Sequence, residues 1–183
     1  MYASKRTLGA RESSASNLER RRTSGLRNTV GFDWQPETNA LYGVDNGRDW
    51  LGDNLPPEKV NQIKEGGFYG WPYLYGDNQP DPAFGKEARD RTSHAIPPVY
   101  GLPAHVAPLS ILFIRHSKMA KFGAAALVAE HGSWNRSQEI GYQVVALYWR
   151  HGQITEEQFL TGFRPFATRF GGTSRNRYSR ATA

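Results

Sequence analysis

An arginine and an asparagine, Arg27 and Asn28, stand directly before the first strand-like segment, in the stretch GLRN at residues 25–28. A guanidinium binds a carboxylate through paired hydrogen bonds, and an asparagine amide offers a further donor and acceptor beside it. At the start of a strand, the two side chains could hold a ligand rich in carboxylate or carbonyl oxygens. Taken alone, however, the four residues favour an ordinary turn with a solvated arginine.

The stretch VDNGRDWLGDNLPPEKVNQI, residues 44–63, carries six charged side chains, two prolines and two glycines. An EF-hand calcium loop needs oxygen ligands at alternate positions, then a glycine and a distal glutamate, and the order here does not fit from Asp45 or Asp49. Backbone carbonyls of a glycine-containing turn can still bind Ca²⁺. Three interpretations therefore remain open: a solvated loop, a cation-binding loop and part of an active site.

The histidines show no paired spacing and predict no zinc site. The five are His94, His105, His116, His131 and His151. A single histidine beside a turn is more often a hydrogen-bonded structural residue than a base or a ligand. The sequence also contains no glycine-rich phosphate loop, nucleophile elbow or dinucleotide fingerprint.

The elements that must position these residues are short strands. Aromatic residues make up 13% of the chain, which also has 19 glycines and 11 prolines. Segments rich in β-formers alternate with turn residues, at 29–35, 41–45, 110–115, 124–130 and 142–150. This pattern predicts an all-β fold, and a sandwich, a barrel and a propeller are all consistent with it. The stretch 70–99 is too long for a simple connector, which predicts a functional or disordered loop.

The net charge of +6 at pH 7 lies in the two ends of the chain. Residues 1–27 carry +5 and residues 164–183 another +5, whereas residues 28–163 carry −4. The acidic middle argues against nucleic-acid binding, and the basic ends, poor in apolar periodicity, predict disordered tails. The chain has no cysteine, no apolar run of the roughly 18 residues that a membrane span needs, and no signal-peptide order at its start.

Five segments, taken in order, resemble the glucose/sorbosone dehydrogenase family of sugar dehydrogenases that use pyrroloquinoline quinone. They are GLRN…GF, DNGRDWLGDNLPPEKVN, EGGFYGWP, HVAPL and AEHGSWNRS…GY, and the sorbosone-dehydrogenase-like branch is the nearest match. The resemblance implies a six-bladed β-propeller of four-stranded antiparallel blades. We therefore expect a partial propeller of about two to three blades at residues 25–163, with uncovered blade faces, between disordered or out-of-frame tails at 1–24 and 164–183.

The resemblance also implies site residues. Arg27 and Asn28 match a pair that contacts the quinone, and the backbone carbonyls of Gly47 and Arg48 match two that hold an active-site Ca²⁺. Better-known members have proline where Arg48 stands, which a carbonyl ligand tolerates. The acidic side chains of the same loop, Asp49, Asp53 and Glu58, are then expected to shape and solvate it rather than to form a ligand cage.

Three further positions are implied by the same comparison. Tyr100 lies where an aromatic contact to cofactor or substrate is expected. Arg136 could take the place of a lysine that pairs with the cofactor in some members. Asp77, in the loop after GWP, could help to bind a second, structural calcium ion.

The implied function is a fragment of an enzyme that oxidises a sugar carbon, with hydride transfer to the quinone assisted by calcium. The family's general base is a histidine from an earlier blade, and no histidine here lies in its motif, so we expect the chain alone to be inactive. Dye reduction with calcium, quinone and several aldoses tests this expectation. The alternative is a non-catalytic β-propeller binding module. Relatives are usually exported, which implies a periplasmic or secreted location.

Overall fold

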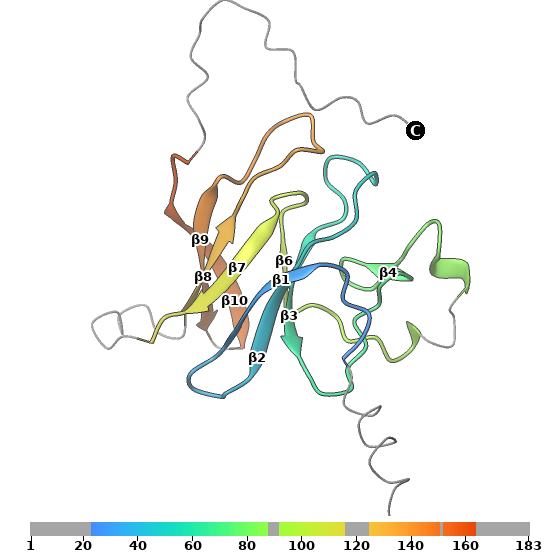
Figure 1. Cartoon of the computed structure of the whole chain (residues 1–183), viewed down its shortest axis with the longest axis horizontal. Helices are drawn as coiled ribbons and strands as arrows, with labels where there is room; N and C mark the ends of the chain where they lie inside the picture. Colours follow the sequence, from blue (N-terminus) through green and yellow to red (C-terminus); the bar gives the residue numbers. More distant parts are fainter. Residues whose placement is uncertain (1–22, 88–91, 116–124, 151, 164–183) are drawn as a thin grey trace, which may run out of the picture.

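The structure, a computed structural model, describes residues 23–87, 92–115, 125–150 and 152–163 (Figure 1). These residues form ten β-strands, most of them in two four-stranded antiparallel sheets. The predicted all-β fold is therefore confirmed. The tail predicted for 164–183 lies outside the described residues, as does the tail predicted for 1–24 apart from its last two residues.

The first sheet forms because β-forming segments with alternating burial are joined by tight turns. The predicted strand segments 29–35 and 41–45 form its first hairpin, with the Asn39 N–H donating to the Gln35 carbonyl at 2.8 Å and Asn39 at a φ of 55°. The strand order is β1-β2-β3-β6. The bounds are β1 (Thr29–Trp34), β2 (Leu41–Asp45), β3 (Glu58–Ile63) and β6 (Tyr100–Leu102).

The second sheet is a simple antiparallel meander. Its strand order follows the chain from the inner strand β7 to the outer strand β10. The bounds are β7 (Pro108–Phe113), β8 (Ala125–Glu130), β9 (Gln143–Arg150) and β10 (Gln153–Leu160). The buried residues on β8 and β9 are mostly small or β-branched, as expected for strands that pack closely against a neighbouring sheet.

The two sheets pack face to face around one core. The core residues come from both sheets and include Tyr42, Val44, Val60, Phe113, Val128 and Leu147. The inner strands β1 and β7 lie next to each other (Figure 1). At this crossing a Cβ on Gly31 would lie 2.5 Å from the Ser110 Cα, so only glycine allows the two backbones to approach. Two neighbouring meanders with adjacent first strands match two propeller blades, within the predicted range.

The outward-facing side chains of the inner strands are exposed within the described part of the chain, whereas Asn61 and Ala146, on the same faces further out in the two sheets, are buried. On β1, Val30, Phe32 and Trp34 alternate with the buried Gly31 and are 46–60% exposed. On β7, Leu109 and Leu112 are 46% and 54% exposed. The expectation of uncovered blade faces therefore holds for these inner strands and not for the whole of either face.

The long stretch from Gly70 is partly ordered into small elements. It contains β4 (Leu74–Tyr75), β5 (Gln79–Pro80) and the 3-10 helix η1 (Gly85–Glu87). The buried Asp81 begins the turn before η1, since its Oδ1 accepts hydrogen bonds from the Ala83 and Phe84 N–H groups at 2.8 and 3.2 Å. No helix in the described residues is both long and apolar enough to cross a membrane.

Candidate functional site

Four loops meet at one edge of the two blades. The register pairs the start of β1 with the end of β2 and the end of β2 with the start of β3, and the start of β7 with the end of β8 in the same way. Because the strands are antiparallel, the segments that precede β1 and β7 lie beside the β2–β3 and β8–β9 loops. In residue numbers these are 25–28, 103–107, 46–57 and 131–142.

These loops enclose a cavity of about 270 Å³. It brings together three residues that the sequence predicted as one site, Arg27, Asn28 and Gly47. The remaining wall is formed by Asn46, Asp49, Glu58, His105, Ala107, Leu109 and Trp134. Both blades contribute, so packing of the sheets forms the cavity.

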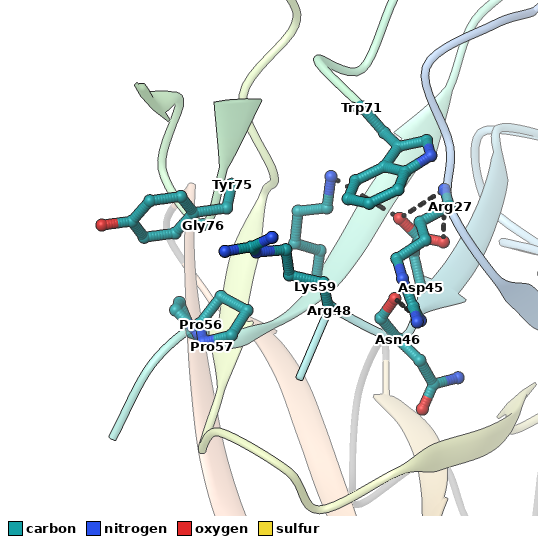
Figure 2. Close-up of a pocket in the computed structure, with 11 residues that line it drawn as sticks. Arg27, Asp45, Asn46, Arg48, Pro56, Pro57, Lys59, Trp71, Tyr75 and Gly76 are labelled. Carbon is teal, nitrogen blue, oxygen red and sulfur yellow. Dashed lines mark hydrogen bonds and ion pairs between the residues drawn. The ribbon is translucent and has the colours of Figure 1, made fainter. Parts of the chain in front are cut away.

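The carboxylate of Asp45, fully buried at the end of β2, fixes the backbone of the arginine–asparagine pair. Its Oδ1 accepts hydrogen bonds from the Arg27 N–H at 3.1 Å, the Asn28 N–H at 2.7 Å and the Thr29 hydroxyl at 2.9 Å. Its Oδ2 lies 3.5 Å from the Lys59 Nζ, which is also buried. The Arg27 and Asn28 side chains remain exposed while their backbone is held. Figure 2 shows Asp45 between Arg27 and Lys59.

Behind the arginine lies a small void of about 10 Å³, with room for about one water molecule. The guanidinium carbon of Arg27 is 5.6 Å from the centre of the Trp71 ring that lies over it (Figure 2). The Lys59 Nζ also donates to the Tyr69 carbonyl at 3.1 Å. Burial lowers the pKa of Lys59, although Asp45 acts in the opposite direction. The residues around this void therefore support the Arg27 side chain from behind.

A second buried carboxylate, Glu58 at the start of β3, connects the β2–β3 loop to the segment that precedes β7. One oxygen accepts a hydrogen bond from the Gly47 N–H and the other accepts one from the His105 N–H at 3.1 Å. Burial raises the pKa of Glu58 to about 6, although both hydrogen bonds lower it. The expectation that this side chain solvates the loop is wrong, since it is 4% exposed and holds backbone groups instead.

The backbone carbonyls of Gly47 and Arg48 are the two groups that were predicted to hold calcium. Among the described residues, no hydrogen-bond donor reaches either carbonyl oxygen, while the neighbouring Asn46 carbonyl accepts from the Arg27 Nη1 at 3.2 Å. A Cβ on Gly47 would lie 2.6 Å from the Pro56 Cγ, so the tight turn requires glycine. Arg48 is tied down by its side chain, with Nε 3.0 Å from the Asp81 Oδ2. Oxygen is the ligand that Ca²⁺ prefers.

Side-chain metal clusters are absent from the part of the chain that the structure describes, where no three acidic, histidine or cysteine residues gather. Asp77, predicted to help bind a second calcium, is exposed between β4 and β5 and does not line the cavity. Its backbone carbonyl accepts a hydrogen bond from the Gln79 side chain at 3.2 Å. Asp77 therefore lies outside the cavity wall, as does Arg48.

Two other predicted residues lie outside the cavity wall. Tyr100 lines a separate, open cavity beside β10, where burial and the Glu156 carboxylate raise the pKa of its phenol. Arg136 extends across the rim, with Nη1 donating to the Asp53 carbonyl at 2.7 Å and Nη2 to the Asn54 Oδ1 at 3.1 Å. Arg136 therefore joins the β8–β9 loop of one blade to the β2–β3 loop of the other.

His105 lies in the cavity wall, although its sequence context favoured a structural role. Its Nε2 is 2.9 Å from the Gly52 carbonyl, and because a carbonyl only accepts, this nitrogen carries the proton. Its Nδ1 is 3.9 Å from the Asp49 Oδ1. The residue is 5% exposed, and its ring connects the segment before β7 to the β2–β3 loop, which agrees with the structural interpretation. His116 and His151 lie outside the described residues.

Glu130 is buried at the end of β8, at the edge where the loops meet, and its carboxylate allows the cost of a buried charge to be measured. Burial raises its pKa to about 7; one oxygen accepts from the Gln143 amide at 2.8 Å, and the other has no hydrogen-bond partner in the described structure. Because the folded state binds the proton more tightly than the unfolded state, whose pKa is near 4.5, stability falls as pH rises from about 4.5 to 7.

We expect Glu130→Gln, which stays neutral, to stabilise the protein at pH 8 by on the order of 1–3 kcal/mol and to give little gain near pH 4.5. Urea unfolding at several pH values measures the difference. The exposed Glu157→Gln on β10 is the control and should change stability by less than about 0.5 kcal/mol throughout. An equal gain for Glu130→Gln at both pH values would contradict the buried charge.

Comparison with known proteins gives one sequence family and one set of similar folds. Residues 74–161 match the TrAA12-like family model. A 125-residue segment, 67% of this chain, is 47% identical to an uncharacterized protein of Borreliella burgdorferi, and it spans 33% of that protein. The chain therefore spans about a third of the length of this relative.

Three solved structures share the fold. A calcium structure of a Trichoderma reesei family AA12 carbohydrate-active enzyme is 24% identical with a TM-score of 0.64, over 75% of this chain and 43% of that chain. The holo form of the pyranose dehydrogenase PQQ domain of Coprinopsis cinerea is 24% identical with a TM-score of 0.52, over 76% and 40%. The soluble aldose sugar dehydrogenase of Escherichia coli, in its apo form, is 20% identical with a TM-score of 0.52, over 74% and 35%. The described residues have the fold of part of such a β-propeller.

Proposed function

We propose that this chain forms part of the cofactor and calcium site of a sugar dehydrogenase that uses pyrroloquinoline quinone, in a branch similar to sorbosone dehydrogenases. The observation that carries the proposal is the cavity that gathers Arg27, Asn28 and Gly47 from separate segments of the chain. Each of the three has its backbone held by a buried carboxylate while the cavity side stays open. An exported location, as the resemblance implies, belongs to the same proposal.

The chain's own residues have distinct roles in this proposal. The Arg27 guanidinium and the Asn28 amide bind the carboxylate and carbonyl oxygens of the cofactor, because both side chains are exposed at the cavity. The Gly47 and Arg48 carbonyls hold calcium, and Glu58 keeps that turn in place. When bound, the quinone supplies a hydride acceptor and calcium supplies a Lewis acid.

The proposal includes that this chain alone does not turn over sugar. A dehydrogenase of this kind needs a base that accepts the proton of the sugar hydroxyl. His105 is the histidine that lines the cavity, and its ring is already anchored by Gly52. This arrangement supports a structural role for His105 and agrees with a base supplied by another part of a longer protein.

Quinone uptake by the full chain tests the proposal. We expect saturable binding of pyrroloquinoline quinone that requires Ca²⁺, and quenching of tryptophan fluorescence measures this binding. We expect no dye reduction when glucose is added. Arg27→Ala should weaken quinone binding about 10- to 100-fold, because it removes charge-assisted hydrogen bonds of about 1.5–3 kcal/mol.

The matched control is Arg115→Ala, which removes an exposed arginine that pairs with Asp33 away from the cavity. It should leave quinone affinity unchanged. Absence of saturable uptake, or an equal loss in both variants, would contradict the proposed site. Clear turnover of glucose by the wild-type chain would contradict the proposed inactivity alone.

A further inference from the structure

Two tryptophans stand exposed at the mouth of the cavity. Trp50 of the β2–β3 loop is 78% exposed and Trp134 of the β8–β9 loop is 69% exposed. Their ring centres are 6.1 Å apart and their planes are at 87°, so the two indoles form a T-shaped aromatic corner. Trp134 also lines the cavity. Large aromatics that remain exposed beside a cavity commonly mark a binding surface.

The backbone under this corner is held in a costly conformation. Trp50 has a φ of 70°, in the left-handed region that bulky residues rarely adopt, at a cost of roughly 1–3 kcal/mol. The two loops are fastened to each other through Arg136 and through the Ser137 N–H, which donates to the Asp53 Oδ2 at 3.1 Å. The indoles are thus presented by loops that are tied together, which lowers the entropy lost when a ligand binds.

The surroundings of the corner indicate the chemistry of its ligand. The apolar indole faces adjoin a cavity wall of hydrogen-bonding groups that includes Asn28, Asp49 and Glu58. A pyranose ring has the matching character, with C–H groups on its face and hydroxyls around its edge. The cavity volume of about 270 Å³ lies below the roughly 300–1,000 Å³ of typical ligand pockets. A cofactor inside it would therefore leave the sugar at the mouth, against the indoles.

We propose that Trp50 and Trp134 form a stacking subsite that binds a sugar ring at the mouth of the cavity and selects for it. This inference rests on the proposed function for the identity of the neighbouring cofactor site. Sugar stacking on the indoles is nevertheless measurable without the cofactor, so the two proposals can fail separately.

The test is a titration of the full chain with glucose and with cellobiose, measured by isothermal titration calorimetry with and without bound quinone. We expect Trp134→Ala and Trp50→Ala each to raise the sugar Kd about 3- to 10-fold, from an aromatic contribution on the order of 0.5–1.5 kcal/mol. Trp134→Phe should keep most of the sugar affinity. The quinone Kd should stay unchanged in Trp50→Ala, because Trp50 does not line the cavity.

The control is a second exposed T-shaped pair, Phe32 and Trp34, whose ring centres are 6.2 Å apart on β1 and which does not line the cavity. Trp34→Ala should leave the sugar Kd unchanged. The inference is overturned by absence of sugar binding to the wild-type chain, by an unchanged sugar Kd in Trp134→Ala, or by an equal loss in Trp34→Ala. Tryptophan-dependent binding of tetramethylammonium in place of sugar also overturns it, because it would reveal a cation cage.

Discussion

Asp45→Ala is expected to lower the free energy of unfolding by about 3–5 kcal/mol, the range for breaking a buried ion pair. The carboxylate is fully buried, and its removal leaves the Lys59 ammonium buried without its charged partner. Three donors at the start of β1 also lose their acceptor, so the Arg27–Asn28 segment is expected to lose its fixed geometry. Urea unfolding measures the stability, and quinone uptake measures the effect on the site.

A second substitution separates the charge from the packing. Asp45→Asn keeps the shape of the side chain but leaves the Lys59 ammonium unpaired, so it should also lower the stability. The double variant Asp45→Asn/Lys59→Met removes that ammonium and should recover much of the stability that Asp45→Asn loses. Glu37→Gln, in the exposed turn between β1 and β2, is the control and should change stability by less than about 0.5 kcal/mol. A loss of less than about 1 kcal/mol in Asp45→Ala would show that the carboxylate does not hold this edge together.

The sequence predicted β1, β2, β7, β8 and β9 because their side chains follow a simple rule. Alternating burial on β1 and the apolar runs of β8 and β9 are properties of neighbouring residues, and these can be recognised along a single chain. The short strand β6 was not predicted, since its three residues pair with β3 across a gap of some forty residues. Pairing at that distance depends on tertiary packing and leaves no local pattern.

The aromatic segment EGGFYGWP shows the same difference between local pattern and packing. Of its aromatic residues Tyr69 is the fully buried one at 1% exposure, whereas Trp71 is half-buried over Arg27. The Tyr69 hydroxyl donates to the Gln62 carbonyl at 2.6 Å and accepts from the Lys64 N–H at 2.7 Å. A phenol can be fully buried here because β3 and the residue that follows it supply these partners, and residue type alone does not reveal them.

The candidate site was predicted in part for a similar reason. Arg27, Asn28 and Gly47 belong to ordered motifs, so a resemblance could identify them. The buried carboxylates that hold them, Asp45 and Glu58, looked like ordinary loop charges, because their partners are backbone N–H groups contributed by distant segments. An acidic residue directly at a strand end, beside apolar neighbours, is the available signal, and it is weak without the fold.

Gly31→Ala is the second substitution with a large expected effect. The added methyl group would lie 2.5 Å from the Ser110 Cα and 2.8 Å from the Leu109 carbonyl oxygen, which are backbone atoms that no side-chain rotation can move. The inner strands must therefore separate, at a cost of about 3 kcal/mol, the upper part of the usual range for overpacking. Urea unfolding measures this cost. Since the cavity wall comes from both blades, quinone and sugar binding should weaken as well.

Gly101→Ala provides the matched control, because it places the same methyl group on a strand glycine with free space. Its Cβ would meet only the Pro57 Cβ, at an ordinary 3.7 Å, so stability should stay constant or rise by up to about 1 kcal/mol. If both variants unfold like the wild type, β1 and β7 do not approach as closely as described. If Gly31→Ala alone loses stability and binding together, the contact between the two blades is what forms the site.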